Sequence, residues 1–170
     1  MAIKKKKIEI HLLLILCIGI GCSNNNNFLN MIINKRASRN VNFERGKENW
    51  EKRANKNNIY ESLKYLTKAI NENGENLERS KLMSQACHFT AEYFEDDETK
   101  SDSLYLLGKD TVWSFITKTD SYIEGFNKFS GDLDGKKIAG IDNISENDIE
   151  VLFWWVKNYV SFIANKPVTE

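Results

Sequence analysis

The chain has 170 residues, of which 24 are basic and 24 are acidic, so its formal net charge is zero. A neutral chain without a basic patch lacks the charge that nucleic-acid binding requires. Of the three cysteines, Cys17, Cys22 and Cys87, only Cys87 lies beyond the N-terminal segment, which excludes a framework of disulfides within one domain.

The N-terminus has the pattern of a secretory signal. Four lysines, Lys4 to Lys7, precede an apolar run over residues 11–21. A membrane-spanning helix needs about 20 apolar residues, so this shorter run predicts a cleaved signal peptide over residues 1–21. Its removal takes away four lysines and one glutamate and leaves 20 basic and 23 acidic residues, a net charge of −3.

Small residues precede Cys22 in "GIGC", and the polar stretch "SNNNN" follows it. This arrangement resembles the lipobox of bacterial lipoproteins, although Gly19 stands where that pattern prefers leucine. The resemblance implies that Cys22 is acylated and becomes the mature N-terminus, and several acyl chains hold a protein stably on a membrane. Cys17 is a poorer candidate because apolar residues follow it. Plain secretion with an incidental cysteine is the alternative.

After Cys22 the chain continues with a low-complexity stretch that cannot bury a core. Residues 28–36, "FLNMIINKR", are predicted to form either a short first helix or a hinge. We therefore expect a tether with a short N-terminal helix over residues 22–45 and a folded domain over residues 46–170. This organisation predicts a lipid-anchored protein of the bacterial envelope that faces the periplasm. Ser23 favours the outer membrane over the inner one, because inner-membrane retention is often linked to aspartate at that place.

Helical periodicity dominates the rest of the chain. Ile59, Leu63, Leu66 and Ile70 recur at helical spacing before Gly74, which predicts a helix that ends at this glycine. Further helices are expected over residues 77–94, 100–118 and 120–128, then a glycine-rich loop over residues 130–140. A last helix is expected from Ser145 to Lys166, opening with a sequence like a capping box, "SEND". The predicted fold is all-α, with antiparallel helical hairpins forming a degenerate tetratricopeptide-like repeat. The helix starts do not fit a strict period of about 34 residues.

Two of these helices have faces that can be assigned. In the helix over residues 77–94, Ser84, His88 and Glu92 fall on the polar stripe, opposite an apolar face of Leu82, Met83, Ala86, Phe89, Thr90, Tyr93 and Phe94. In the last helix the predicted apolar face contains Ile149, Leu152, Phe153, Val156, Val160 and Ile163, widened by Trp155, Tyr159 and Phe162. Trp154 falls on the polar stripe of that helix. It is therefore either covered by another element or available to a partner.

Gly108 interrupts a helical pattern in "LYLLGKDTVWSFI". A glycine at this place costs about 1 kcal/mol of helix propensity relative to alanine, so packing should compensate. Helical spacing puts Gly108 at the centre of the apolar face, where a missing side chain lets a neighbouring helix approach closely. Ala86 and Ala91 on the preceding helix are the expected counterparts.

Three segments in order resemble a known family: "SKLMSQACHFTAEYFEDD", "SLYLLGKDTVWSFI" and "NDIEVLFWWVKNYVSFIANKP". They are similar to successive parts of the T component associated with TRAP transporters, the TatT family. The residues that match its motifs are Leu104, Tyr105, Gly108, Asp110, Leu152, Trp154, Asn165 and Lys166. The resemblance covers residues 80–167 and consists of packing motifs. It departs from the family at Lys109, where arginine is usual, and at "KTDSY", where the family has a turn resembling His-Pro-Gly.

The resemblance implies a non-enzymatic periplasmic lipoprotein that binds the substrate-binding P component of a TRAP-type uptake system and holds an apolar ligand between its helices. The expected partner or ligand contacts are Tyr105, Trp113, Trp154 and Tyr159. Further copies of the chain are another class of partner, giving a homo-oligomer. The alternative function is a surface-exposed helical lipoprotein that acts as an adhesin or interaction module.

Residues with catalytic or metal-binding chemistry are few. His88 is predicted to be a surface histidine beside Glu92, and Cys87 lies about 100° away from it around the helix, which is poor geometry for a dyad. The acidic run over residues 95–98 and the pair Asp132 and Asp134 lack the ligand spacing of an EF-hand. They are expected to be solvated turns. No catalytic residue, metal or cofactor is therefore expected.

Overall fold

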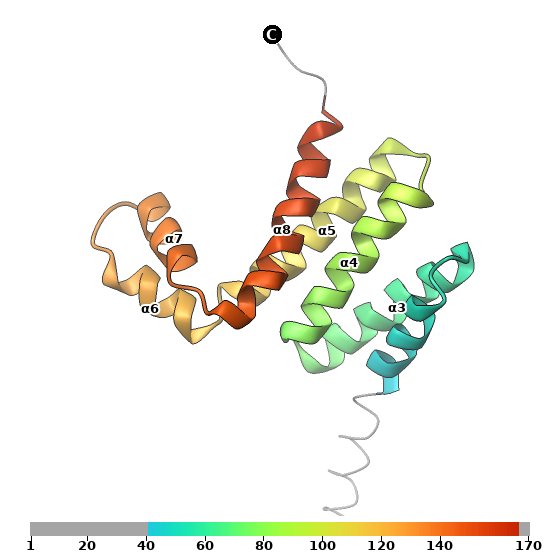
Figure 1. The fold of residues 1–170 in the computed structure, drawn as a ribbon, viewed down its shortest axis with the longest axis horizontal. Coiled ribbons are helices and arrows are strands. Elements are labelled where there is room, and N and C mark those ends of the chain that lie inside the picture. Colours follow the sequence, from blue (N-terminus) through green and yellow to red (C-terminus); the bar gives the residue numbers. More distant parts are fainter. Residues whose placement is uncertain (1–40, 167–170) are drawn as a thin grey trace, which may run out of the picture. The chain divides into compact units, whose positions relative to one another are not determined.

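The computed structural model describes residues 41–166, which form seven helices packed antiparallel and contain no strand (Figure 1). The first helix covers residues 41–51. The others are α3 (Lys56–Asn73), α4 (Leu77–Tyr93), α5 (Glu98–Ile116), α6 (Asp120–Lys128), α7 (Leu133–Asp142) and α8 (Glu146–Ala164). The all-α prediction is thus confirmed for these residues. The predicted signal peptide, Cys22 and the tether up to residue 40 lie outside them.

Short polar side chains begin most of these helices. Asn55, Asn76, Asp97 and Asp132 each accept a hydrogen bond from a backbone N–H in the first turn of α3, α4, α5 and α7, respectively. Such caps satisfy donors that a helix leaves unpaired at its start. The capping box predicted at Ser145 is not formed, because the Ser145 hydroxyl bonds the Asp148 carboxylate at 2.6 Å and caps no backbone N–H.

The first hydrophobic core joins helix 41–51, α3 and α4. Its buried members are Phe43, Ile59, Leu63, Leu66, Ala69, Leu82, Met83, Ala86 and Cys87. The Ser62 hydroxyl donates to the Gly46 carbonyl at 2.8 Å, which ties α3 to the preceding helix. The domain boundary expected at residue 46 therefore falls inside a helix that supplies Phe43 to the core. None of the helices in the described range is long and apolar enough to cross a membrane.

The second core joins α5, α6 and α8 around Val112, Ile116, Tyr122 and Val151. Here the prediction of a glycine-rich loop over residues 130–140 is wrong, because residues 133–142 form α7 and pack against α6. The glycines serve close packing between these helices. A Cβ atom at Gly125 would lie only 2.3 Å from the Ala139 carbonyl oxygen, and one at Gly140 would lie 2.6 Å from the Tyr122 ring.

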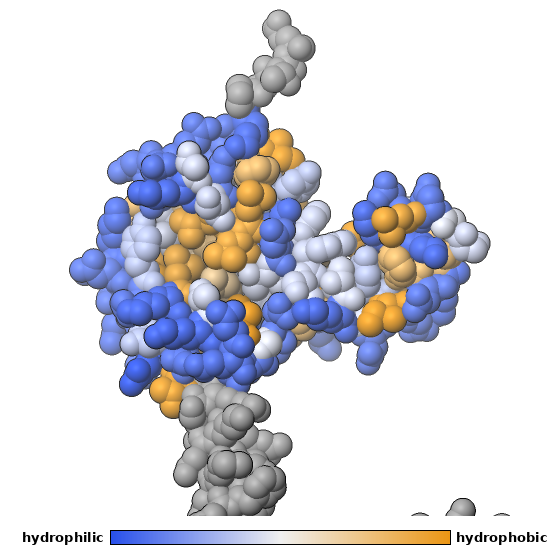
Figure 2. All heavy atoms as spheres, turned by 180° about the vertical axis from the view of Figure 1, so that it is seen from behind, coloured by the Kyte–Doolittle hydropathy of each residue, from blue (hydrophilic) through white to orange (hydrophobic). Residues whose placement is uncertain are grey.

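Helix α8 packs along α5 and α4 with the opposite face from the one predicted. Val151 and Asn158 are fully buried on the packed side. Five residues of the predicted apolar face are instead exposed: Ile149, Phe153, Val156, Val160 and Ile163. Figure 2 shows apolar side chains gathered on the surface near the C-terminal end of α8. The prediction assumed that the most apolar face of α8 would be the packed one. The face that packs instead includes the polar residue Asn158.

Candidate functional site

His88 of α4 points toward α5 and α8 and is buried there, so the prediction of a surface histidine is wrong. Its side chain is only 7% exposed, and its ring centroid lies 5.6 Å from Tyr105 and 6.0 Å from Trp154. Burial lowers the pKa of His88, the nearby charge of Lys157 lowers it further, and Glu92 opposes both. Two members of the predicted polar stripe, Ser84 and His88, are buried because α8 packs on α4, whereas Glu92 stays exposed.

Cys87 is the next residue in sequence, but it belongs to the core that α4 shares with α3. Burial raises the pKa of its thiol, which favours the unreactive protonated form. His88 instead contacts α5 and α8. The Cys87 and His88 side chains therefore lie on different sides of α4, one toward α3 and the other toward α5 and α8.

Asn158 of α8 is bonded to α4 through its amide and lies closely against Gly108 of α5. Its Nδ2 atom donates to the Ser84 carbonyl at 3.2 Å, to the Ser84 hydroxyl at 2.9 Å and to the Trp154 carbonyl at 2.9 Å. Gly108 provides the space, since a Cβ atom there would lie 2.8 Å from Asn158 Oδ1. The close approach at Gly108 is thus made by α8. The predicted counterparts on α4, Ala86 and Ala91, are not the residues nearest to this position. Ala86 lies in the core with α3, and the Ala91 carbonyl accepts a hydrogen bond from Ser101 of α5.

Tyr105 and Trp154, two of the predicted contact residues, belong to this buried cluster. The Tyr105 hydroxyl donates to the Glu92 carboxylate at 2.9 Å, and burial together with this hydrogen bond raises the pKa of Tyr105 to about 12. Trp154 is half-buried against His88, so a helix of the same chain covers part of it. Tyr105 thus connects α5 to α4, and Trp154 packs α8 against α4.

The other two predicted contact residues, Trp113 and Tyr159, belong to a row of aromatic rings. Trp155 joins them, with its ring centroid 5.7 Å from Trp113 and 5.4 Å from Tyr159. Tyr122 extends the row on the far side of Trp113 at 5.8 Å. The four rings come from α5, α6 and α8, and they link the second core to the exposed face of α8.

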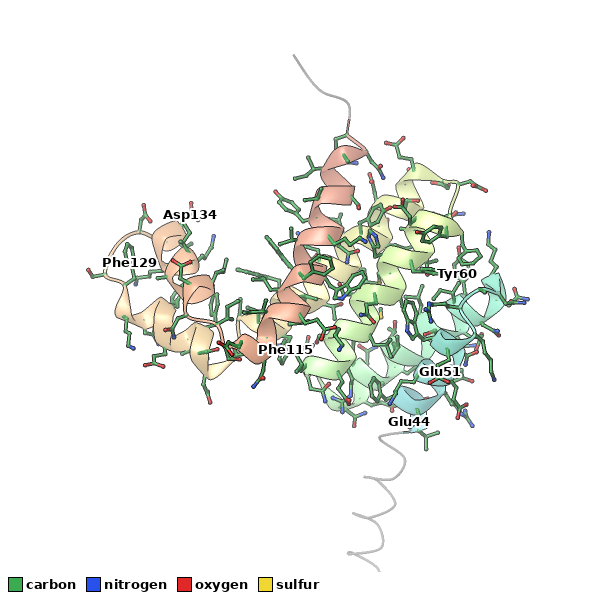
Figure 3. All side chains as sticks on the ribbon, in the orientation of Figure 1. Glu44, Glu51, Tyr60, Phe115, Phe129 and Asp134 are labelled. Atoms are coloured by element: carbon green, nitrogen blue, oxygen red, sulfur yellow. The ribbon has the colours of Figure 1, made fainter. Side chains whose placement is uncertain are left out.

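An open pocket of about 420 Å³ lies at the Tyr122 end of this row, between α5, α6 and α7. Its volume lies within the range of about 300–1,000 Å³ that is usual for small-molecule sites. The lining residues are Trp113, Thr117, Tyr122, Ile123, Phe126, Asn127 and Lys137. Lys137 is the only lining residue with a charge, and its Nζ atom lies 3.0 Å from an oxygen of Asp134, which Figure 3 shows on α7. The pocket thus has aromatic walls and a cation at its edge.

Sequence reasoning missed most of this pocket. Tyr122 and Phe126 have the spacing of one helical face within the predicted helix over residues 120–128, which was the available signal. Lys137 was assigned to a loop, so its position beside these rings was not expected. The four predicted contacts do not form one site, since Tyr105 and Trp154 lie in the buried polar cluster and Trp113 and Tyr159 in the aromatic row.

The chain matches no protein-family model, no curated protein and no solved structure. Across residues 41–166, no group of histidine, cysteine and acidic side chains is arranged to hold a metal ion. The motif resemblance to TatT therefore stays a hypothesis, and the geometry of the pocket is the main guide to function.

Proposed function

We propose that the protein is a non-enzymatic, lipid-anchored periplasmic accessory of a TRAP-type solute uptake system, with a degenerate tetratricopeptide-like fold. In this role it binds the substrate-binding P component and holds an apolar ligand. The observation that carries the ligand-binding part is the open pocket walled by Trp113, Tyr122 and Phe126. The antiparallel helical hairpins and the quoted TatT-like motifs support the rest.

The pocket chemistry favours an apolar or aromatic molecule that carries an anionic group. Flat rings offer a large apolar contact area with little conformational freedom to lose. Each CH₂ group that a ligand buries against them contributes about 0.8 kcal/mol. Lys137 at the edge attracts a carboxylate, although Asp134 competes for it. An aliphatic or aryl carboxylic acid fits this combination.

The ligand-binding part is tested with the full chain and a fluorescent anilinonaphthalene sulfonate, displaced by a medium-chain fatty acid. The pocket variant is Ile123→Glu, which places a carboxylate on the lining. The matched control is Ile138→Glu, because Ile138 is an exposed isoleucine of α7 that does not line the pocket. We expect Ile123→Glu to weaken binding at least about tenfold, equivalent to about 1.4 kcal/mol, and Ile138→Glu to leave it unchanged. Equal affinities for both variants would exclude this pocket.

The partner part is tested by isolating the protein from native membranes and identifying what is recovered with it. Recovery of a periplasmic solute-binding protein is expected, and its absence would count against the transport role. Protease treatment of intact cells separates this role from that of a surface adhesin. A periplasmic accessory is shielded from the protease, whereas a surface protein is cut.

A further inference from the structure

The outward face of α8 carries a continuous apolar stripe that no described helix covers. The stripe consists of Ile149, Phe153, Val156, Val160 and Ile163, whose exposed fractions lie between 44% and 57%. The opposite face is the one that packs on α5 and α4, through Val151 and Asn158. A contiguous apolar patch that is left exposed on a helix commonly marks an interaction site. The stripe therefore indicates a second packing partner.

The spacing within the stripe indicates what kind of partner. Successive members are separated by four, three, four and three residues, which is the alternation of the a and d positions in a coiled coil. Over these residues the stripe is about 21 Å long, since a helix rises 1.5 Å per residue. Such a seam fits the same kind of seam on another helix.

We propose that this stripe is a self-association surface, on which α8 of a second copy of the chain packs antiparallel about a two-fold axis. An axis that passes between residues 154 and 155 places Phe153 opposite Val156 of the partner subunit and Ile149 opposite Val160 of the partner subunit. Each contact occurs twice because the interface is two-fold symmetric. Ile163 then lies at the rim of the interface.

Charge complementarity selects this orientation. In the antiparallel register, Glu150 on the flank of one stripe lies beside the partner's Lys157, and the symmetry axis repeats the pair. Glu150 is also 3.0 Å from Lys81 of its own chain but stays mostly exposed, and Lys157 makes no ion pair among the described residues. In a parallel coiled coil the flanking positions would instead place Glu150 near the partner's Ser145 and Lys157 near the partner's Leu152. The parallel arrangement thus loses both ion pairs.

Cysteine cross-linking in the full chain tests the proposal. In the antiparallel register, the two copies of residue 156 are offset by about 4.5 Å along the helix axes, whereas the two copies of residue 149 are offset by about 16 Å. Mild oxidation should therefore link Val156→Cys into a dimer of twice the chain mass and leave Ile149→Cys unlinked. Both positions are exposed, so both variants should fold, and the unchanged chain serves as the control for Cys17, Cys22 and Cys87.

Three other results would overturn the proposal. Equal linking of Val156→Cys and Ile149→Cys would indicate a parallel dimer. Links only to proteins of other masses would assign the stripe to a different partner. No link at either position would exclude an α8 interface. A charge-reversal series gives an independent check: Glu150→Lys and Lys157→Glu should each lower the dimer yield of Val156→Cys, and the two together should restore it.

Discussion

The two faces of α8 differ in a way that hydrophobicity alone does not predict. The packed face is centred on Asn158, a polar residue that is fully buried, whereas the outward face has five large apolar residues in contact with solvent. The packed face fits because Gly108 and Ser84 supply space and hydrogen-bond partners at the same level of α5 and α4. Helix packing here follows local complementarity more closely than apolar content.

The buried hydrogen bonds between Asn158 and Ser84 also restrict where α8 can lie on α4 and α5. A buried amide that loses its partners costs about 1–3 kcal/mol, so sliding or rotating α8 away from Ser84 is unfavourable. The apolar stripe on the other face imposes no such restriction within the chain. Substitutions on the packed face of α8 should therefore cost more stability than substitutions on its outward face.

Replacing Gly108 with leucine should have the largest effect. A Cβ atom added at this position would lie 2.8 Å from Asn158 Oδ1 and 2.9 Å from its Cγ atom, and Asn158 is fully buried. Overpacking of this kind costs about 1–3 kcal/mol or more, which urea or thermal unfolding would measure. Leu107→Ala, at an exposed position on the same helix, is the control. An unchanged melting temperature for Gly108→Leu would mean that α5 and α8 are not packed this closely.

Replacing Asn158 with alanine should be the next most damaging change, because it leaves the Ser84 hydroxyl without this donor in a buried place. We expect a loss of about 1–3 kcal/mol in the free energy of unfolding. A double-mutant cycle with Ser84→Ala measures the contact itself. If the effects of the two single changes simply add, the hydrogen bond between them does not stabilise the fold.

His88 should make the stability depend on pH. Its pKa in the folded protein is lowered by burial, so between the unfolded value of about 6.5 and the lower folded value the unfolded chain binds more protons. The contribution of His88 to stability should therefore be complete above about pH 6.5 and be lost as the pH falls from about 6.5 toward the lowered folded value. Unfolding curves at several pH values would show this. His88→Gln should flatten the dependence in that interval, and an equally steep dependence in the variant would assign it to other groups.

The smallest effect is expected on the outward face of α8. Val160→Ser removes an apolar side chain that is already exposed, so the stability of the monomer should change by no more than about 0.5 kcal/mol. Unfolding at low protein concentration, where association is minimal, is the relevant measurement. A loss as large as that of Asn158→Ala would indicate that the stripe is covered within the chain.

Much of the fold was predictable because its helices have strong local signals. Gly74 ends α3, and the helix over residues 120–128 was predicted with the bounds that α6 has. The error at α7 has a physical cause: Asp132 caps a helix whose glycines let it approach α6, and sequence alone does not distinguish such glycines from those of a loop.

The candidate site was less predictable, because it depends on which helices meet. Ser84, His88 and Trp154 all fall on polar stripes in the sequence, and these three side chains are covered only because α8 lies across α4 and α5. Trp113 and Tyr159 were expected to contact a ligand, but Trp155, which joins them, was placed only on the flank of an apolar face. Pairing between helices far apart in sequence is not encoded in the periodicity of either one.

The indole rings of Trp113 and Trp155, with centroids 5.7 Å apart and planes inclined at 37°, form a closely coupled pair of chromophores. Their electronic transitions should mix, which splits the circular-dichroism band of tryptophan into two lobes of opposite sign. One ring borders the pocket and the other belongs to α8. Small rotations in either region would change the splitting, so the protein carries its own optical reporter of conformational change and needs no attached label.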